Sequence, residues 1–423
     1  LFFTTFLHFL QGNLIILQKY YKKKFEKYIK SDKMLLVMKM SIRENFDIYF
    51  ELVEDIRSQA HITYRLSDVL FLIICGIISG CNDLEIIVEF GEERLDFFKK
   101  HTELEKIPCL STISNIINII NPNHLELCLY GIFNNVFKVK IGIKEITIDG
   151  KTICSTAKMK EYEKPMHIIT AILVDNAVSL GQKVIESKSN EIPAVRELID
   201  ELDIKGAVVT MDAMHCQKET AEKIIDNGGD YVLQLKANQG RFYEDVYAMF
   251  DDKYMDVADK DCEYEIYSTL EKSRDRIEKR TCYVLNEVAY FTNYISEWKG
   301  LKKIFAVKRE IEKNGEKTVE ISCYLSSKNA SAEKLLSYTR KHWQVESFHW
   351  LLDMNYDEDE SRVRNKNSQE CLNILRKYAI SILKKYIENN PVKRKALSAN
   401  MRKCMMNEEY LESVLKYYCH TQM

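Results

Sequence analysis

The sequence is poor in the two residues that most often interrupt a fold. Only 5 of its 423 residues are proline and 14 are glycine, which argues against long flexible linkers. Hydrophobic residues make up 46% of the chain. This is enough for a sizeable core, and it excludes wholesale disorder. We expect a chain of this length to fold as two or three domains.

Cysteine patterns that would indicate zinc are also missing. The 12 cysteines form no Cys-x-x-Cys pair and no Cys/His spacing typical of a zinc site. Several stand in apolar stretches, including Cys75, Cys282 and Cys323. We interpret them as reduced, buried thiols of a cytoplasmic protein.

No hydrophobic run predicts a membrane span, so we expect no membrane partner. The first ten residues are apolar but too short to cross a bilayer. The basic run Lys19 to Lys30 follows them, which is the reverse of a signal peptide's order. We interpret residues 1–43 as an extension of doubtful status, and residues 1–40 carry no assigned function. The expected true start is Met34, Met38 or Met40.

Charge is nearly balanced over the whole chain but not along it. The net charge of −2 excludes a polycation. From Arg362 to Lys403, however, 12 Lys and Arg residues stand against 2 acidic ones, Glu370 and Glu388. Such a local excess suits a polyanionic partner. The alternative is a solvated basic helix.

The order of the expected elements predicts a helical region followed by an α/β region. Residues 44–138 are expected to be mostly helical, either binding DNA, assisting dimerisation or simply packing. Residues 143–236 then predict three strands in succession, followed by helix, strand, helix and strand. This is the order of the ribonuclease-H-like fold, although other α/β folds share pieces of it. The predicted elements are 144–149, 166–174, 178–186, 190–202, 206–212, 216–227 and 230–236.

A mainly β insertion is expected to interrupt this core at residues 240–327. Strands are predicted around Cys282, Val288, Ile304 and Val319, and Asn314-Gly315 is typical of a hairpin turn. The last core helix is predicted at 331–353. The expected domains are 44–138 (helical), 139–239 (first part of the core), 240–328 (insertion), 329–390 (last part of the core) and 391–423 (basic helical tail).

Three carboxylates are candidates for a metal-dependent active site. Asp149 and Asp212 each end an apolar run, and Glu346 lies in the last core helix. Carboxylates at the C-terminal ends of buried strands point into the crevice where α/β sheets bind ligands. Divalent cations such as Mg²⁺ prefer oxygen ligands. Two of them about 4 Å apart stabilise the attacking and leaving oxygens of a phosphoryl displacement.

Each carboxylate also has a structural interpretation. Asp149-Gly150 is a common turn pair, although Gly150 also permits close approach of a metal or phosphate. Asp212 is a candidate N-cap of the next helix. Glu346 is either a surface ion-pair residue or a carboxylate held ionised by the cations at 340–342.

Other polar residues are candidates for DNA contacts. Lys151 and Lys236 are placed to hold phosphates as point charges, and the polar run Lys188-Ser-Asn-Glu191 could line the same groove. The charged run from Arg274 to Arg280 is either a DNA-contacting arm or a solvated face. Two side chains near Glu346, His342 and His349, could contact phosphates or position water.

The two tryptophans near Glu346 have two interpretations. Trp343 and Trp350 are expected to pack in the core, which is the commoner fate of tryptophan on a helix. The alternative is stacking on an unstacked base.

The ordered set of motifs resembles the DDE transposases of bacterial insertion sequences, in the H-repeat-associated protein group. The resemblance covers roughly residues 44–420. The segments that carry it are Ile148-Asp149-Gly150-Lys151, Lys188-Ser-Asn-Glu191-Ile, Thr210-Met-Asp212-Ala-Met-His215-Cys-Gln217, Asp230-Tyr-Val-Leu233, Leu235-Lys236-Ala-Asn238-Gln239-Gly240, Arg276-Ile-Glu278-Lys-Arg280, His342-Trp343-Gln-Val-Glu346, His349-Trp350-Leu-Leu-Asp353 and Glu358-Asp359-Glu-Ser361-Arg362.

This resemblance implies a fold, an activity and a site. It implies a ribonuclease-H-like catalytic core in which Asp149, Asp212 and Glu346 form the triad that holds two Mg²⁺ or Mn²⁺ ions. The activity implied is cleavage and strand transfer at terminal inverted repeats of double-stranded DNA. A homodimer on DNA is our expectation, because two ends must be held together. The expected DNA contacts are Lys151, Lys188, Lys236, Arg276, Arg280, Arg340, His342, His349 and Arg362.

The chain departs from the group at a few positions. Arg274-Asp275 stand where the group usually has His-Gly, and Ser347 stands where an Asn usually follows the catalytic Glu. Asp353 occupies a position that is Lys in wider transposases. Two alternatives therefore stay open: an inactive or repurposed transposase-derived DNA-binding protein, and a stand-alone metal-dependent nuclease.

Overall fold

The structure is a computed structural model that describes residues 41–50, 53–58, 60, 62–126, 128–129, 145–153, 165–174, 178–185, 190–251, 264–273, 275–361 and 363–420. The predicted DNA contacts Lys188 and Arg362 lie outside this part of the chain. The chain divides into two compact units. One contains the described residues before 141, those at 152–166 and those from His349 onward; the other contains 145–151 and His167–Phe348.

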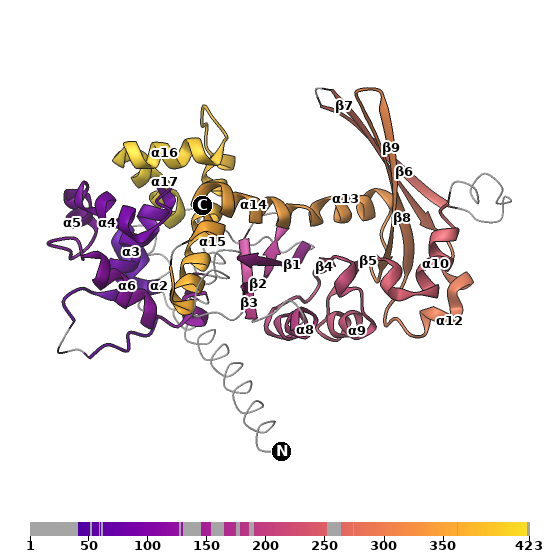
Figure 1. Cartoon of the computed structure of the whole chain (residues 1–423), viewed down its shortest axis with the longest axis horizontal. Coiled ribbons are helices and arrows are strands. Elements are labelled where there is room, and N and C mark those ends of the chain that lie inside the picture. Colours follow the sequence, from indigo (N-terminus) through magenta and orange to yellow (C-terminus); the bar gives the residue numbers. More distant parts are fainter. Residues whose placement is uncertain are drawn as a thin grey trace, which may run out of the picture. The chain divides into compact units, whose positions relative to one another are not determined.

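The second unit is built on a sheet of nine strands in the order β3-β2-β1-β4-β5-β9-β8-β7-β6 (Figure 1). β4 pairs in parallel with both β1 and β5, whereas β2 and β3 are antiparallel. The five strands predicted within 143–236 are confirmed. They are β1 (Glu145–Ile153), β2 (Met166–Leu173), β3 (Val178–Ile185), β4 (Val208–Met211) and β5 (Asp230–Leu235).

The β-rich insertion continues this sheet. Its strands are β6 (Tyr264–Ser273), β7 (Arg276–Leu285), β8 (Lys303–Lys313) and β9 (Glu316–Ser326). β9 pairs antiparallel with β5, so the insertion and the core share one set of ladder hydrogen bonds. The hairpin predicted at Asn314-Gly315 is confirmed. Both residues have positive φ, 52° and 84°, as a two-residue type I′ turn requires.

The strand predicted at Val288 is wrong. The chain instead forms a short 3-10 helix, η9 (Ala289–Phe291), followed by α12 (Thr292–Ile295). Helical turns bring Phe291 and Tyr294 onto the same ring, that of Phe242, at centroid distances of 6.1 and 4.5 Å. Burial of this aromatic cluster on α10 (Arg241–Ala248) outweighs the local strand propensity.

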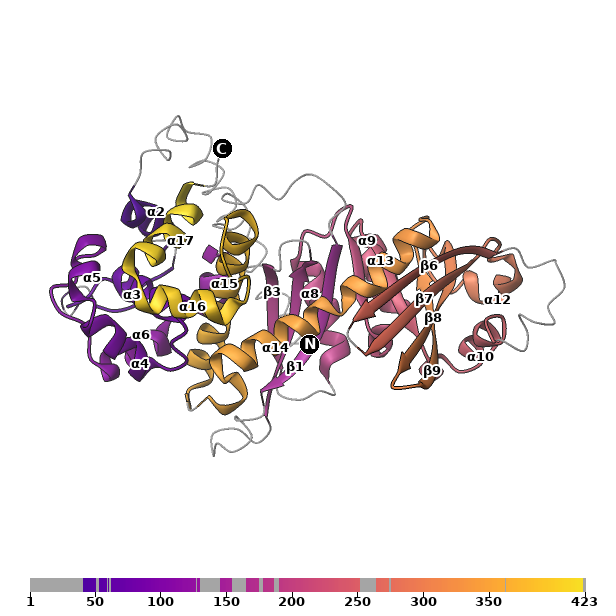
Figure 2. The same ribbon diagram turned by 90° about the horizontal axis from the view of Figure 1, so that it is seen from above.

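Helices cover both faces of the core sheet. α8 (Glu191–Glu201) packs on β3, and α9 (Lys218–Asp226) packs on β5 and on α8. α13 (Ala332–His342) packs on β4, β6 and β7, and Figure 2 shows it lying over the strands. α13 buries Leu335 and Leu336, each of which contributes about 1.5–3 kcal/mol. These leucines pack with the buried sheet residues Val208, Val232, Cys282, Val284, Phe305 and Val307.

The last core helix is not continuous as predicted. It ends at His342, and a second helix, α14 (Gln344–Tyr356), begins after Trp343. Glu346 therefore lies in the first turn of a new helix.

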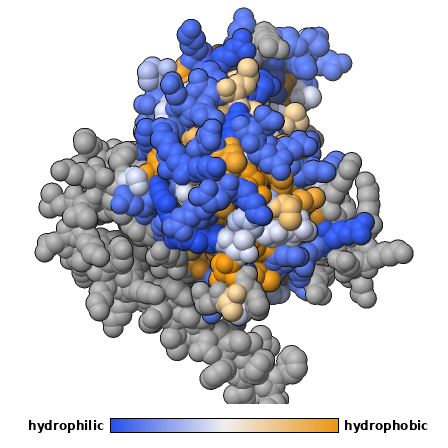
Figure 3. All heavy atoms as spheres, turned by 90° about the vertical axis from the view of Figure 1, so that its left-hand side faces the viewer, coloured by the Kyte–Doolittle hydropathy of each residue, from blue (hydrophilic) through white to orange (hydrophobic). Residues whose placement is uncertain are grey.

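The first unit is helical. Its N-terminal helices are α2 (Ile42–Phe50), α3 (Leu66–Ile78), α4 (Leu84–Glu92), α5 (Leu95–His101) and α6 (Leu110–Ile119). They share a core with α15 (Lys366–Asn389), α16 (Leu397–Met406) and α17 (Glu408–His420), because α15 packs on α3, α6, α16 and α17. Every residue of α3 is buried. Figure 3 shows one face on which hydrophilic side chains predominate, with hydrophobic ones gathered between them.

The basic run is not uniformly solvated. Arg376 and Lys377 of α15 are 2% and 1% exposed. Arg376 donates to the carbonyl of Asn82 at 2.7 Å and lies 3.8 Å from Glu358. At least these two cations belong to the core of the helical unit rather than to a DNA-binding surface.

Two sequence-based expectations can be compared with the described residues. The structure reports nine free cysteines, eight buried and Cys109 exposed, so the expectation of buried thiols is confirmed for those eight. Among the described helices, none combines the length and apolarity that crossing a membrane would require.

Candidate active site

The site is organised by two neighbouring parallel strands. Thr147 of β1 and Thr210 of β4 are register partners, and their hydroxyl oxygens lie 2.8 Å apart. Asp149 and Asp212 each stand two residues further along. Because side chains alternate with a period of two, both aspartates are level with each other and on the same face as the threonine pair. Neighbouring strands are about 4.8 Å apart, which brings the two carboxylates together.

Asp149 lies within its strand rather than at its end. β1 runs on to Ile153, four residues beyond the predicted boundary. The turn interpretation of Asp149-Gly150 is therefore wrong. Gly150 is needed because of a close approach: a Cβ there would lie 2.4 Å from Nε2 of His167 and 2.7 Å from Oε1 of Glu191.

The electrostatics of Asp149 show that several carboxylates share this place. Burial raises the pKa of Asp149 to about 6, against the opposing effect of a backbone hydrogen bond from Gly150. The charges of Asp212, Glu191 and Glu346 raise it further. Both other members of the predicted triad therefore lie within electrostatic range of Asp149.

Asp212 presents an unsatisfied oxygen. It precedes the short helix η7 (Ala213–His215) but makes no side-chain cap, so the capping interpretation is not realised. Its Oδ1 is buried without a hydrogen-bond partner, and Nε2 of His215 lies 3.9 Å away. The side chain as a whole is 45% exposed, so solvent and ligands can reach it.

Glu346 is exposed on α14, and it is not held by the cations expected to ionise it. Arg340 pairs with Glu271 at 2.5 Å, and Lys341 pairs with Glu145 at 2.9 Å. Desolvation and the charge of Asp212 raise the pKa of Glu346. The expectation that neighbouring Lys and Arg would favour its charged form is wrong, because those cations find acidic partners on strands.

His342 is the third residue of the predicted cationic group at 340–342. It contacts the Thr147–Thr210 pair. Its Nδ1 lies 3.3 Å from Oγ1 of Thr210. Burial lowers the pKa of His342 to about 4, although the charge of Asp212 opposes the shift. His342 is therefore neutral at neutral pH and can serve a phosphate only through a hydrogen bond.

The donor set was compared with the needs of a divalent cation. In the described ranges, no three His, Cys, Asp or Glu side chains converge closely enough to hold a metal ion as they stand. The chemistry nevertheless fits. The donors are carboxylate oxygens, and Oδ1 of Asp212 has no hydrogen-bond partner. Burial and, to a lesser extent, repulsion from neighbouring carboxylates raise the pKa of Asp149. A hard cation would satisfy that oxygen and relieve that repulsion.

The tryptophans near Glu346 are not in the core. Trp343 and Trp350 are 58% and 59% exposed, so the core-packing prediction is wrong. Trp350 lies on the same face of α14 as Glu346 by its i+4 spacing, whereas Trp343 directly precedes that helix. His349 is buried instead. Four other side chains of α14 are buried: Val345, Phe348, Leu352 and Tyr356.

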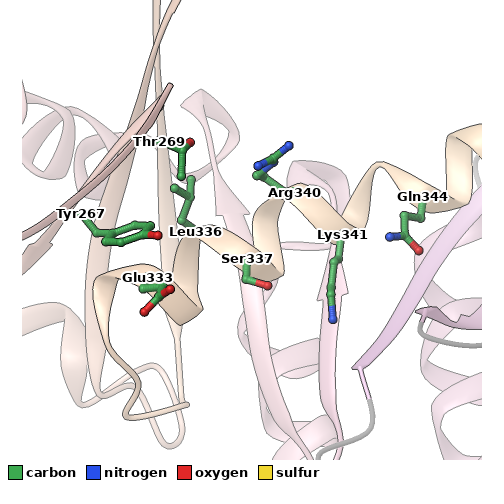
Figure 4. Close-up of a pocket in the computed structure, with 8 residues that line it drawn as sticks. All are labelled: Tyr267, Thr269, Glu333, Leu336, Ser337, Arg340, Lys341 and Gln344. Atoms are coloured by element: carbon green, nitrogen blue, oxygen red, sulfur yellow. The ribbon is translucent and has the colours of Figure 1, made fainter. Parts of the chain in front are cut away.

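A groove of about 380 Å³ runs along α13 (Figure 4). Tyr267 and Thr269 of β6 line one end, and the rest of the wall comes from Glu333, Leu336, Ser337, Arg340, Lys341 and Gln344. Its two cations are the ones that already pair with Glu271 and Glu145. The groove is therefore close to neutral.

The remaining predicted DNA contacts differ in their surroundings. Lys236 is exposed and Lys151 is half-buried. Arg276 and Arg280 each lie 2.5 Å from Glu278, which Arg309 also contacts at 2.5 Å. Arg280 also contacts Glu271 at 3.2 Å, and Arg309 contacts Glu320 at 3.7 Å. Acidic side chains therefore offset the charge of these arginines.

Three buried polar residues beside the site were not singled out from the sequence. Glu191, mentioned above only as part of a polar run, lies between His167 and His215, and all three are at most 2% exposed. A lone histidine in the apolar strand Met166–Leu173 was the available signal for His167.

The chain was compared with known proteins. Residues 142–382 match the family described as Transposase DDE domain, and residues 48–131 match the region described as DDE_Tnp_1-associated. The chain is 36% identical over 383 residues to "Putative transposase YncI" of Escherichia coli O157:H7, covering 89% of this chain and 95% of that protein. It is 36% identical over 378 residues to "H repeat-associated putative transposase YhhI" of Escherichia coli strain K12, covering 87% and 96%.

Two further similarities cover a shorter part of this chain or have a lower sequence identity. "Inactive transposase YbfQ" of Escherichia coli strain K12 is 37% identical over 71 residues, which cover 16% of this chain and 84% of that protein. Among solved structures, piggyBac transposase in a synaptic complex with hairpin DNA matches with a TM-score of 0.42 and 10% identity. That match covers 91% of this chain and 79% of the other.

Proposed function

This chain belongs to the Transposase DDE domain family, and on that premise we propose that it cleaves DNA at terminal inverted repeats and transfers the freed strands to a target. The catalytic carboxylates in this proposal are Asp149, Asp212 and Glu346. The observation that carries it is the pairing of Thr147 with Thr210. An aspartate follows each of these threonines by two residues, so alternation predicts that the two carboxylates face the same side.

The proposal includes a ribonuclease-H-like core. Its support is the strand order β3-β2-β1-β4-β5, with β1, β4 and β5 parallel and β3 antiparallel to β2. In this arrangement Asp149 lies in the first strand and Asp212 directly follows the fourth. Helix α14 follows the insertion and supplies Glu346.

Each carboxylate has a role in the proposed chemistry. Asp149 and Asp212 would hold the cations, and Glu346 would complete one of the two sites. Bound there, Mg²⁺ or Mn²⁺ would supply the Lewis acidity that activates the attacking oxygen and stabilises the leaving one.

The proposal also includes contacts with DNA. Trp343 directly precedes α14, three residues before Glu346, and is 58% exposed, which suits stacking on an unpaired base. Lys236, which is exposed, suits a phosphate contact. A homodimer on DNA is part of the proposal, because transposition joins two ends held at the same time.

The test uses the purified chain and a DNA fragment carrying the repeats that flank its gene. Incubation with Mn²⁺ or Mg²⁺ is expected to give nicked ends and joined products, and Asp212→Ala is expected to give neither. Cleavage without joining would favour a stand-alone nuclease. Specific binding without cleavage under either metal would favour a repurposed DNA-binding protein, an outcome made concrete by the relative named as an inactive transposase.

A further inference from the structure

A buried carboxylate bridges two histidines beside the aspartates. Glu191 is the first residue of α8. Its Oε2 lies 2.9 Å from Nε2 of His167 in β2, and its Oε1 lies 3.0 Å from Nε2 of His215 in η7. We call these three residues the Glu191 clamp.

The Glu191 clamp reaches the segments that carry both aspartates. On one side the clamp packs closely against Gly150, the residue after Asp149. A Cβ added at Gly150 would lie 2.4 Å from His167 and 2.7 Å from Glu191. On the other side it holds His215, whose Nε2 lies 3.9 Å from the unpaired Oδ1 of Asp212. One carboxylate therefore links the backbone of β1 to the turn that follows β4.

Stability alone is a weak explanation for such a cluster. A buried carboxylate with two imidazoles loses its hydration, and well-packed apolar residues of similar volume often stabilise a fold as well or better. Polar groups behind metal-binding side chains have a different value, since they fix the orientation of the ligands. The contacts with Gly150 and His215 place the clamp in that position for both aspartates at once.

We propose that Glu191, through His167 and His215, positions Asp149 and Asp212 for binding a divalent cation. Glu191 is a positioning residue in this proposal, and it rests on the proposed function of the two aspartates. Its loss would let the β1 segment at Gly150 and the turn at His215 relax independently, so the two carboxylates would no longer meet a cation at a fixed separation.

The first experiment measures binding of Mn²⁺ alone to the full chain, by the electron paramagnetic resonance signal of free Mn²⁺, without DNA. Glu191→Gln is expected to weaken Mn²⁺ affinity by about 10- to 100-fold, as loss of an outer partner commonly does. The matched control is Glu358→Gln. Glu358 is also fully buried and accepts a hydrogen bond from Asn373 at 2.7 Å, but it belongs to the helical unit. This control is expected to leave Mn²⁺ affinity unchanged.

A second variant removes no polar group. Gly150→Ala keeps Glu191 and both histidines but forces them away from β1. It is expected to weaken Mn²⁺ binding in the same direction, and it tests the proposal even if Glu191→Gln does not fold. Circular dichroism establishes that each variant is folded before titration.

Cleavage kinetics separate positioning from a general loss of structure. In Glu191→Gln the Mn²⁺ concentration for half-maximal cutting is expected to rise, with the rate largely restored at saturating Mn²⁺. In Asp149→Asn no Mn²⁺ concentration restores it. The role of the clamp would be overturned if folded Glu191→Gln or Gly150→Ala kept the Mn²⁺ affinity of the unaltered chain and the same Mn²⁺ concentration for half-maximal cutting. An unaltered chain that binds no Mn²⁺ would overturn the proposed function itself, and the clamp with it.

Discussion

Thr147 and Thr210 join β1 to β4 through hydroxyl groups 2.8 Å apart, and each stands two residues before a candidate catalytic aspartate. The pair fixes which residues of the two strands are level. Nδ1 of His342 approaches Thr210 at 3.3 Å, so the end of α13 is tied to the same point. Hydrogen bonds between these uncharged side chains therefore hold β1, β4 and the end of α13 together next to the two aspartates.

Replacing Thr210, which contacts both Thr147 and His342, tests this support. Thr210 is 4% exposed, and Thr210→Val would leave the hydroxyl of Thr147 and Nδ1 of His342 without this partner. The expected loss is about 1–3 kcal/mol in the free energy of unfolding, measured by urea denaturation. The double variant Thr147→Val/Thr210→Val should lose less than the two single variants together. Strict additivity would contradict the coupling.

Asp149→Asn should separate activity from stability. Burial and neighbouring carboxylates raise the pKa of Asp149 to about 6, so its charged form is disfavoured in the folded, metal-free chain. A neutral amide is therefore expected to maintain or raise the melting temperature at pH 7.5 while abolishing cleavage. Thermal unfolding and end-cleavage assays check the two effects. Cleavage at the unaltered rate would refute the assignment.

The same pKa predicts how metal binding depends on pH. Below about pH 6, protons compete with the cation for Asp149, so Mn²⁺ affinity should rise up to that pH and then level off. The stability of the metal-free fold should change in the opposite direction. Because the folded pKa lies above the ordinary 3.8, this carboxylate's contribution to stability falls as the pH rises from 3.8 to about 6. Titrations with Mn²⁺ at pH 5, 6, 7 and 8 measure this dependence. An affinity that is the same at all four pH values would exclude Asp149 as a ligand.

Trp343→Ala should weaken binding of end DNA without weakening the fold. A stacked base contributes about 1–3 kcal/mol, measured here as a fluorescence-anisotropy affinity for a fragment with an unpaired terminal base. Tyr290 is equally exposed, at 58%, and Tyr290→Ala is the control. Trp298→Ala, at 1% exposure, should instead destabilise the fold by about 3–5 kcal/mol. Equal DNA affinity in the two exposed variants would exclude stacking by Trp343.

Sequence periodicity was sufficient for the core strands and for the hairpin at Asn314-Gly315, because those signals are local. The end of β1 was misplaced because Asp149-Gly150 is also a favoured turn pair. The close approach of His167 and Glu191 to Gly150, which no local pattern records, accompanies an extended backbone at that point.

Contacts between residues far apart in the sequence account for the other differences between prediction and structure. Arg340 and Lys341 stand beside Glu346 in sequence, yet they pair with acidic residues on β6 and β1. The Glu191 clamp joins a strand, a helix start and a short turn, and no periodicity connects those three. The exposure of Trp343 depends on the break between α13 and α14, which the helical pattern of 331–353 did not indicate.

The pairing of β5 with β9 also constrains the order of events during synthesis. β5 is translated well before its neighbour, and the whole insertion must emerge from the ribosome before this ladder can close. Sheets that depend on such sequence-distant partners form late. Helix α13 and Glu346 come later still, so both aspartates exist in the nascent chain before the third carboxylate does. The growing polypeptide therefore lacks one of the three proposed catalytic carboxylates until Glu346 has been made, and the DNA cleavage proposed for this protein would become possible only after that point.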